Sequence, residues 1–472
     1  MLKNAKPPLK TTIPIFHHSI IPCARQKLSP RKSPLSLVSC TNSETKSRFM
    51  RILNVKNLNH QSKIVNLKSS GRVRGLSFVL MVLYLFYPVI SNAKQDLPCL
   101  KNISSVDALL VANPDGEILY KKHETKKHIP ASTLKLITAL TAIKRLGASY
   151  KFTTEFYMDA DHNLKIKGFG DPLLVSEAWQ EIAGALAKKT KDFNDLILDD
   201  TYFSPQIVIP GSKHSTNPYD APVGALCANF NTVFFHRDHR GRIVSSEPQT
   251  PLIPFARKKI QKLGLKQGRY TFSHDQKETA LYAGNLLLYF LGERGVTCQG
   301  KVCLSAIQPG DRLIYTYQSR FTLEDILRKM MAFSSNFIAN QVFIALGAKV
   351  YGPPCTLAKG VKVVSEFAKN DLHLQHIEIA EGSGISRKNR VSVLDMLAIL
   401  EAFKPYRHLL KRTGNTLYKT GTLRGISTRV GYIDGPSENP YYFVIFLNRP
   451  GSNIDTVLEC VTRSLAHSAK NP

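Results

Sequence analysis

The chain carries the stretch Pro130-Ala131-Ser132-Thr133-Leu134-Lys135, and two more short motifs follow it in order, Ser334-Ser335-Asn336 and Lys419-Thr420-Gly421. A nucleophilic serine needs a base and groups that bind the substrate, and these motifs supply hydroxyl, amine and amide side chains of that kind. Ser-x-x-Lys alone is weak evidence, because it also occurs at residues 29–32 and 43–46 in a polar stretch without helical periodicity. The order of all three motifs therefore favours a catalytic serine at position 132.

The residues around Ser132 predict an amphipathic helix from about Ala131 to Gly147, because apolar residues recur at helical spacing at Leu136, Leu140 and Ile143. Ser132 would lie in the first turn, where unpaired N–H groups and the positive end of the helix are found, and Lys135 would share its face. A lysine accepts the serine proton only when it is largely neutral, which requires burial or a neighbouring cation, and Lys419 could be that cation. The alternative is a capping serine beside a surface lysine.

The second motif also opens a helical pattern, with apolar residues at Phe337, Ile338, Val342, Phe343 and Leu346. Side chains two residues apart at a helix entry can both reach a cleft. We expect Ser334 to pass a proton between the leaving amine and Lys135, and Asn336 to hold the amide of the substrate. The alternative is that serine and asparagine only cap the helix.

The third motif lies in the first of three strand patterns, at residues 417–422, 427–433 and 441–447, which predict an antiparallel sheet. Lys419 and Thr420 are expected to bind a carboxylate by charge and hydroxyl. Gly421 would let a substrate backbone approach closely. The N–H of Ser132 and a strand N–H near Thr422 would form an oxyanion hole. The alternative is a basic residue on an edge strand.

Further segments extend the pattern beyond the three motifs: Gly170-Asp171-Pro172 with Leu174, residues 217–233 (NPYDAPVGALCANFNTV), residues 381–387 (EGSGISR) and residues 419–425 (KTGTLRG). With them the chain resembles the class C low-molecular-mass penicillin-binding proteins, the D-alanyl-D-alanine carboxypeptidase and endopeptidase family, from about Leu109 to Leu447. Two positions depart from that family. Ser335 stands where many members carry Asp, and Glu381 stands where Asp is expected.

The resemblance implies an α/β (α+β) catalytic domain of the penicillin-binding and serine β-lactamase type, with an antiparallel sheet flanked by helices and an inserted strand-rich domain. It implies that Ser132 attacks the bond between two terminal D-alanines of a peptidoglycan stem peptide, or in some members the crosslink between stems. Lys135 is then the proton acceptor and Ser334 the second active serine, without a cofactor, and β-lactams acylate Ser132. Two alternatives remain: a serine β-lactamase or esterase on the same scaffold, and a non-catalytic wall-binding protein.

The gap of nearly 200 residues between Lys135 and Ser334 is filled in that family by inserted, mostly β domains. We therefore expect catalytic segments at residues 94–152 and 303–472, separated by an insertion at residues 153–302. The first catalytic hairpin is predicted at residues 105–120, and the last helix at Thr456–Ala466. Asp171 is expected to serve a turn.

The N-terminal residues 1–93 read as a basic extension with an export signal. An apolar stretch of about 15 residues, Leu76–Ile90, follows Arg72 and Arg74 and ends at the small-residue site Ser91-Asn92-Ala93. This predicts cleavage after Ala93 and a periplasmic protein. The alternative is an uncleaved inner-membrane anchor. A start at Met50 would give a more usual signal length.

The formal net charge of +29 is unevenly distributed, because residues 1–93 hold 15 Lys and Arg against the single acid Glu44. The remaining +15 predicts at most a weak association with an anionic envelope surface. We find no nucleic-acid-binding module. No His or Cys spacing indicates a metal, and His236 and His239 are expected in a solvent-exposed loop.

Six cysteines follow residue 93: Cys99, Cys227, Cys298, Cys303, Cys355 and Cys460. An exported chain would meet an oxidising compartment, where disulfides form. Cys298 and Cys303 flank four residues in a predicted hairpin and could pair across its strands. The alternative is free, buried thiols.

Overall fold

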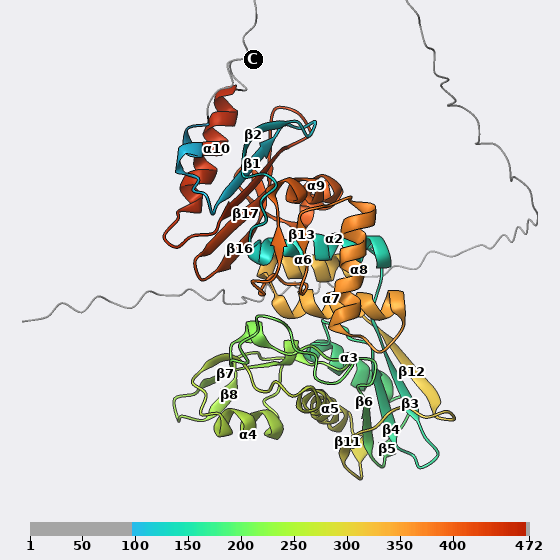
Figure 1. The fold of residues 1–472 in the computed structure, drawn as a ribbon. Helices are drawn as coiled ribbons and strands as arrows, with labels where there is room; N and C mark the ends of the chain where they lie inside the picture. Colours follow the sequence, from blue (N-terminus) through green and yellow to red (C-terminus); the bar gives the residue numbers. More distant parts are fainter. Residues whose placement is uncertain (1–96, 469–472) are drawn as a thin grey trace, which may run out of the picture. The chain divides into compact units, whose positions relative to one another are not determined.

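The computed structural model describes residues 97–468 (Figure 1). The predicted signal segment, its cleavage site after Ala93 and the proposed start at Met50 lie outside these residues. Within them, no helix is both long enough and apolar enough to cross a membrane.

A six-stranded sheet, ordered β15-β16-β17-β18-β1-β2, is antiparallel throughout. Its strands are β1 (Ala108–Ala112), β2 (Ile118–Lys122), β15 (Lys411–Thr413), β16 (Thr416–Leu423), β17 (Ile426–Ile433) and β18 (Tyr441–Leu447). The predicted hairpin and the three predicted C-terminal strands are therefore confirmed. The first and last strands of the sheet along the chain, β1 and β18, are neighbours.

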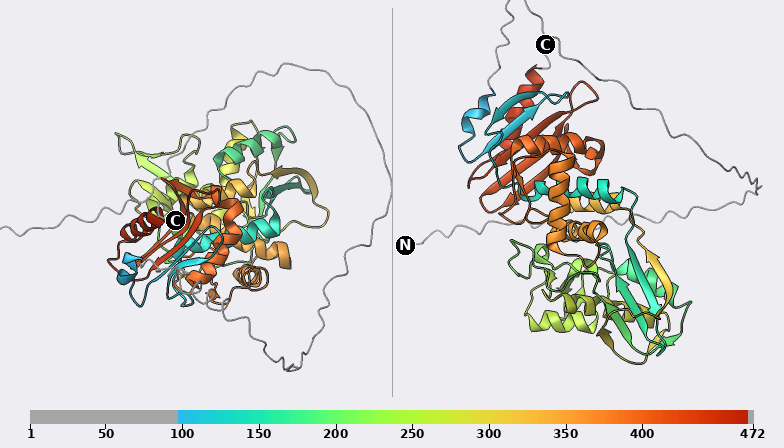
Figure 2. Two further views of the ribbon diagram at one scale, coloured as in Figure 1. Left: turned by 90° about the horizontal axis from the view of Figure 1, so that it is seen from above. Right: turned by 45° about the vertical axis from the view of Figure 1, so that its right-hand side comes forward.

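Strand β18 is apolar along its whole length because both faces of the sheet are covered. Val444 and Phe446 join the core on one face, while Phe443 and Ile445 join the core on the other. Helices α2 (Lys135–Leu146) and α9 (Val393–Phe403) cover the first face, with α6 (Leu323–Phe333), α7 (Asn336–Tyr351) and α8 (Leu357–Glu366) packed behind them. The short helix η1 (Pro98–Asn102) and α10 (Ile454–Ser468) cover the second face (Figure 2). The predicted fold class is confirmed.

A second, five-stranded sheet, ordered β11-β6-β4-β3-β12, belongs to the segment between the first two motifs. Its strands are β3 (Thr153–Met158), β4 (Leu164–Gly168), β6 (Leu196–Asp199), β11 (Val302–Leu304) and β12 (Arg312–Gln318). Helices α3 (Ser176–Leu186) and α5 (Gln276–Gly292) share its separate apolar core around the buried Trp179. Because β12 pairs with β3, this sheet continues past residue 302, where we predicted the insertion to end.

The remaining elements are small. A three-stranded sheet, β8-β7-β9, lies beside helix α4 in the second half of the insertion. Their bounds are β7 (Thr232–Arg237), β8 (Ile243–Ser245), β9 (Gly268–Thr271) and α4 (Pro254–Lys262). Two-stranded pairs join β5 (Asp192–Phe193) to β10 (Thr297–Cys298) and β13 (Ile377–Glu378) to β14 (Arg390–Val391).

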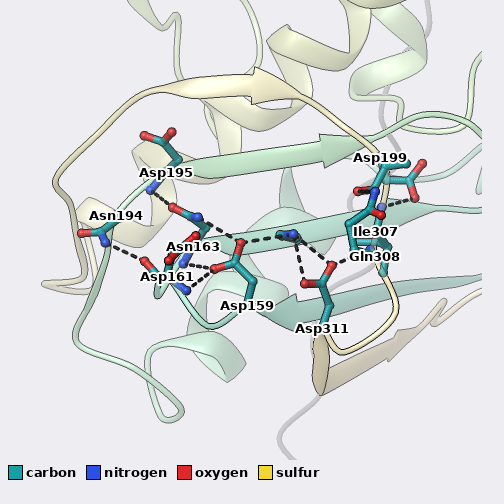
Figure 3. A network of polar contacts seen from close by, with 11 residues as sticks. Asp159, Asp161, Asn163, Asn194, Asp195, Asp199, Ile307, Gln308 and Asp311 are labelled. Carbon is teal, nitrogen blue, oxygen red and sulfur yellow. Dashed lines mark hydrogen bonds and ion pairs between the residues drawn. The ribbon is translucent and has the colours of Figure 1, made fainter.

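A polar network closes one end of the five-stranded sheet, where Asp159 and Asp311 face each other (Figure 3). The ammonium of the buried Lys165 lies between them, 3.0 Å from both carboxylate oxygens of Asp311 and 3.1 Å from Asp159 Oδ2. A buried cation needs such pairing, because its desolvation is otherwise uncompensated. The network thus ties the β3–β4 hairpin to the start of β12.

Of the two possibilities left open for Cys298 and Cys303, the structure shows free thiols, although both are partly exposed. They do not lie on a common hairpin, because β10 pairs in parallel with β5 and β11 pairs in parallel with β6. Instead, Cys99 of η1 is bonded to Cys460 of α10 across 361 residues. The disulfide therefore joins two elements that pack on the same face of the six-stranded sheet.

Candidate active site

Ser132 lies in a tight 3₁₀ turn, η2 (Ala131–Leu134), that leads directly into α2. The predicted helix is confirmed, including its end at Gly147, whose φ of 88° suits glycine. The difference is that α-helical geometry begins only at Lys135. The backbone at Ala131 is left-handed, with φ 49°, and Gly384 packs on its carbonyl so closely that a Cβ at Gly384 would lie 1.8 Å from the oxygen.

The turn is fixed against the six-stranded sheet. A Cβ at Gly421 of β16 would lie 2.9 Å from the backbone nitrogen of Ser132, so only glycine lets the strand approach this closely. Thr428 of β17 donates from Oγ1 to the carbonyl of Pro130 at 2.8 Å. The serine backbone and the strand of the third motif are therefore in contact, which is the arrangement that an oxyanion hole requires.

Lys135 is fully buried and is surrounded by acceptors. Its Nζ lies 3.0 Å from Ser132 Oγ, 2.9 Å from Asn336 Oδ1 and 2.7 Å from the carbonyl oxygen of Ser383. Burial holds the pKa of Lys135 well below its ordinary value of 10.5, the nearby Lys419 lowers the pKa further, and Glu381 opposes both effects. The alternative of a surface lysine is thus wrong.

The second motif opens α7, as predicted, and its first residue also ends α6. Ser334 follows α6 in a left-handed conformation, with φ 51°. Ser335 caps α7, because its side chain accepts a hydrogen bond from the N–H of Ile338 at 3.2 Å, and Asn336 is the first residue of that helix. Capping therefore explains Ser335, whereas Ser334 and Asn336 are held with their side chains toward Lys419 and Lys135.

The third motif presents its residues alternately, as a strand does. Lys419 is only 3% exposed, and its Nζ donates to Ser334 Oγ and to the carbonyl of Thr420, both at 2.8 Å. Burial lowers the pKa of Lys419 to about 8. Gly421 is buried against η2, while Thr420 and Thr422 are exposed.

A buried carboxylate, Glu381, supports the site, and our sequence analysis gave it no role. Its two oxygens accept from the N–H groups of Ser383 and Gly384, both at 2.7 Å, and from Asn389 Nδ2 at 2.7 Å. It also accepts from Ser383 Oγ at 2.6 Å and from the N–H of Ser386 at 3.2 Å. This loop delivers the Ser383 carbonyl to Lys135. In the sequence, the small residues that follow Glu381 were the feature that could have indicated this tight loop.

No group of His, Cys, Asp and Glu side chains between residues 97 and 468 is arranged to hold a metal ion. Asp171 does form a turn, because its Oδ1 accepts from the N–H of Leu173 at 2.8 Å. The segments around residues 132, 334, 381 and 419, which are far apart in sequence, thus meet at a single site.

Comparison of the sequence with known proteins identifies a family. The D-Ala-D-Ala carboxypeptidase 3 (S13) family matches residues 90–263 and 263–413. The chain is 25% identical to the D-alanyl-D-alanine carboxypeptidase DacB of Haemophilus influenzae over 424 residues, which are 76% of this chain and 88% of that one. It is 24% identical to the D-alanyl-D-alanine carboxypeptidase of an Actinomadura species over 436 residues, 76% and 81% of the two chains.

The fold agrees as well. The structure resembles that of penicillin binding protein 4 from Haemophilus influenzae with a TM-score of 0.62 and 21% identity, covering 77% of this chain and 95% of that one. The same protein in complex with a β-lactam matches with a TM-score of 0.59, 20% identity and coverage of 77% and 94%. The resemblance drawn from the sequence is confirmed, and the chain is a serine peptidase that belongs to the D-Ala-D-Ala carboxypeptidase 3 (S13) family.

Proposed function

We propose that Ser132 is the nucleophile of a D-Ala-D-Ala carboxypeptidase that acts on peptidoglycan stem peptides through an acyl-enzyme. The observation that carries this proposal is the set of partners around Lys135 Nζ. Asn336 Oδ1 and the Ser383 carbonyl can only accept hydrogen bonds, so they take two N–H groups of a neutral amine. The lone pair of the amine then points toward Ser132 Oγ, 3.0 Å away.

The proton taken from Ser132 must reach the leaving group. Lys135 holds it while the serine oxygen attacks the carbonyl between the two D-alanines. Ser334, whose hydroxyl oxygen accepts a hydrogen bond from Lys419, then takes this proton from Lys135 as it gives its own to the departing D-alanine amine, which leaves Lys135 neutral again. The N–H of Ser132 and a strand N–H near Thr422 stabilise the oxyanion. Water then hydrolyses the acyl-enzyme and frees Ser132.

Substrate binding falls to the third motif and to Asn336. The charge of Lys419 and the exposed hydroxyls of Thr420 and Thr422 suit the terminal carboxylate of a stem peptide, and the same groups suit the carboxylate of a penicillin. Asn336 would hold the amide of either ligand. Gly421 does not take the substrate-facing role that we expected, because the place of its missing Cβ is filled by Pro130, Ser132 and Thr428.

A β-lactamase on this scaffold is the second candidate, and it would need a base that activates the deacylating water. Glu381 is the carboxylate whose charge acts on Lys135. It is fully buried and already accepts five hydrogen bonds, so it is not free to bind such a water. This supports slow deacylation and a penicillin-binding peptidase.

Intact-protein mass spectrometry after incubation with benzylpenicillin tests the proposal. We expect a lasting mass gain of one penicillin, and we expect Ser132→Ala to lose it. Destruction of the penicillin without a mass gain would favour the β-lactamase. An unmodified protein beside intact penicillin would overturn the catalytic proposal and favour a wall-binding protein.

Purified muropeptides would separate the two peptidase activities. Release of D-alanine from monomeric pentapeptides identifies a carboxypeptidase, and conversion of crosslinked dimers to monomers identifies an endopeptidase. Loss of both products in Ser132→Ala would assign them to one site.

We also propose that the chain is exported to the periplasm and cleaved after Ala93. The disulfide between Cys99 and Cys460 supports this, because disulfides persist in oxidising compartments. The mature N-terminus, determined by mass spectrometry of the protein from the periplasm, is expected at Lys94. Recovery of the uncleaved chain in the inner membrane would favour the anchor.

A further inference from the structure

Positive charge is concentrated in one small part of the insertion. Residues 232–271 contain nine Lys and Arg but only two acidic residues, a formal charge of +7, while residues 97–468 as a whole carry +14. Both acidic residues are engaged, because Asp238 pairs with Arg242 and Glu247 pairs with Arg269. Half of the net charge of the described chain therefore lies in about a tenth of its residues.

The fold gathers these cations on neighbouring elements. Arg257 of α4 donates from NH1 to the carbonyl of Ile243 in β8 at 2.7 Å, which holds the helix beside the β7–β8 hairpin (Figure 1). Ala256 and Ile260 bury one side of α4, so Lys258 and Lys262 project from the opposite side. We call the exposed cations of this region the basic face: Arg237, Arg240, Arg242, Arg257, Lys258, Lys262 and Lys266.

An apolar side chain stands among these cations. Leu263, directly after α4, is 44% exposed and is flanked by Lys262 and Lys266. A soluble polyanion would gain nothing from an exposed leucine. A lipid surface would, because an apolar side chain enters the boundary of the acyl region while neighbouring lysines pair with anionic head groups.

We propose that the basic face docks the protein on the surface of an anionic phospholipid bilayer, with Leu263 entering it. None of the residues that surround Ser132 and Lys135 belongs to this face, so docking does not use the catalytic groups. The attraction is between exposed charges, and it therefore weakens as salt shortens the Debye length.

Flotation of the full chain with vesicles tests the proposal. The vesicles contain about 30% phosphatidylglycerol in phosphatidylcholine, or phosphatidylcholine alone. We expect binding to the anionic vesicles only, and at least about tenfold weaker binding for the combined variant Lys258→Ser, Lys262→Ser, Lys266→Ser. Lys188→Ser, Lys189→Ser, Lys191→Ser removes the same charge from the turn after α3 and should bind as the parent does. Equal loss in both variants, or no binding by the parent, overturns the proposal.

A fluorescent probe at position 263 would distinguish binding to a bilayer from binding to a soluble polyanion. Its signal is local, so it does not depend on the basic N-terminal residues. The chain has one tryptophan, Trp179, which is fully buried, so Leu263→Trp adds a local reporter. We expect its emission to shift to the blue with anionic vesicles. Leu313→Trp, at a position on β12 that is 50% exposed, should not shift. A shift at neither or at both positions, or a Leu263→Ser variant that keeps full vesicle binding, overturns the proposal.

Discussion

Two buried lysines lie at the proposed site, and they are not equivalent. Lys135 is surrounded by acceptors and has Glu381 nearby, whereas Lys419 donates to a hydroxyl and a carbonyl. Each is desolvated, which disfavours its charged form. The proposed roles need opposite protonation states: Lys135 must be neutral to act as a base, and Lys419 must be charged to bind a carboxylate.

The pKa of Lys419, about 8, predicts an alkaline limit on acylation. A lysine is charged below its pKa, so the second-order rate constant for acylation by a penicillin should fall by about fivefold between pH 8 and pH 9, and by about tenfold per pH unit above that. Stopped-flow acylation across pH 6–10 measures it. Lys419→Arg stays charged at every pH in this range and should remove the fall. The same fall in the arginine variant would contradict the assignment.

The charge of Glu381 predicts a change on the acid side of the same profile. The carboxylate favours protonated Lys135, so Glu381→Gln should lower the pKa of Lys135 further and shift the acid limb of acylation to lower pH. The absolute rate should also fall, because a glutamine accepts fewer of the five hydrogen bonds.

Glu381→Asp is the matched control for that experiment, since it keeps the charge and changes the reach. Even where the acylation rate of this variant is lower, the pH at which the rate falls on the acid side should be unchanged. If the glutamine variant is slower but this pH is also unchanged, Glu381 only holds the loop and its charge does not act on Lys135.

At the scale of residues, sequence could name the serine, the two lysines and the asparagine because motif spacing encodes them. It could not give the burial of Lys135 or the contact between Ser383 and Lys135. Both depend on a loop 248 residues away in sequence, held by hydrogen bonds to Glu381. The left-handed backbone at Ser334 was equally hidden, since serine has no special preference for that conformation.

At the scale of elements, the Gly-Asp-Pro segment between β4 and α3 contains a buried acid, Asp171, that the proposed mechanism does not use. Burial raises the pKa of Asp171 from its ordinary value of 3.8 to about 6. The N–H of Leu173 and the hydroxyl of Ser319 lower the pKa, but burial outweighs both. An acid whose pKa is raised by folding costs stability once the pH exceeds its folded pKa, and that cost disappears below its unfolded pKa.

Asp171→Asn should therefore stabilise the protein at pH 8, by on the order of 2–3 kcal/mol, and should have little effect near pH 4. The turn survives because the amide oxygen can still accept from the N–H of Leu173. Urea denaturation at the two pH values measures the difference. Equal effects at both would show that ionisation is not involved.

Periodicity predicted most elements well, including β18 and the helix after Ser132, because their apolar spacing is regular. It failed for residues 298–303. Two short segments joined by three residues resemble a hairpin locally, but each pairs in parallel with a strand that lies about 105 residues earlier in the chain. Long-range pairing of β12 with β3 also extends the five-stranded sheet to Gln318, and no local sequence pattern indicates this boundary.

At the scale of the whole molecule, the disulfide joins the first and last helical elements of the described chain. The variant Cys99→Ala, Cys460→Ala should lose about 2–4 kcal/mol of unfolding free energy, because the bond restricts the unfolded chain. Penicillin acylation under stabilising conditions should persist, since neither cysteine touches the site. The variant Cys298→Ala, Cys303→Ala removes two free thiols and should change stability little. A larger loss in this second variant would contradict the observed pairing.

Strand β1 lies between β2 and β18, so the start of the described chain is paired with its end. Proteins are made from the N-terminus, and Ser132 is completed almost 300 residues before Lys419 and more than 300 before the end of β18. A partly synthesised chain therefore holds a serine that is chemically ordinary. If the proposed mechanism holds, reactivity toward a substrate or an antibiotic arises only when Lys419 and the strands beside it are in position, so growing chains lack it.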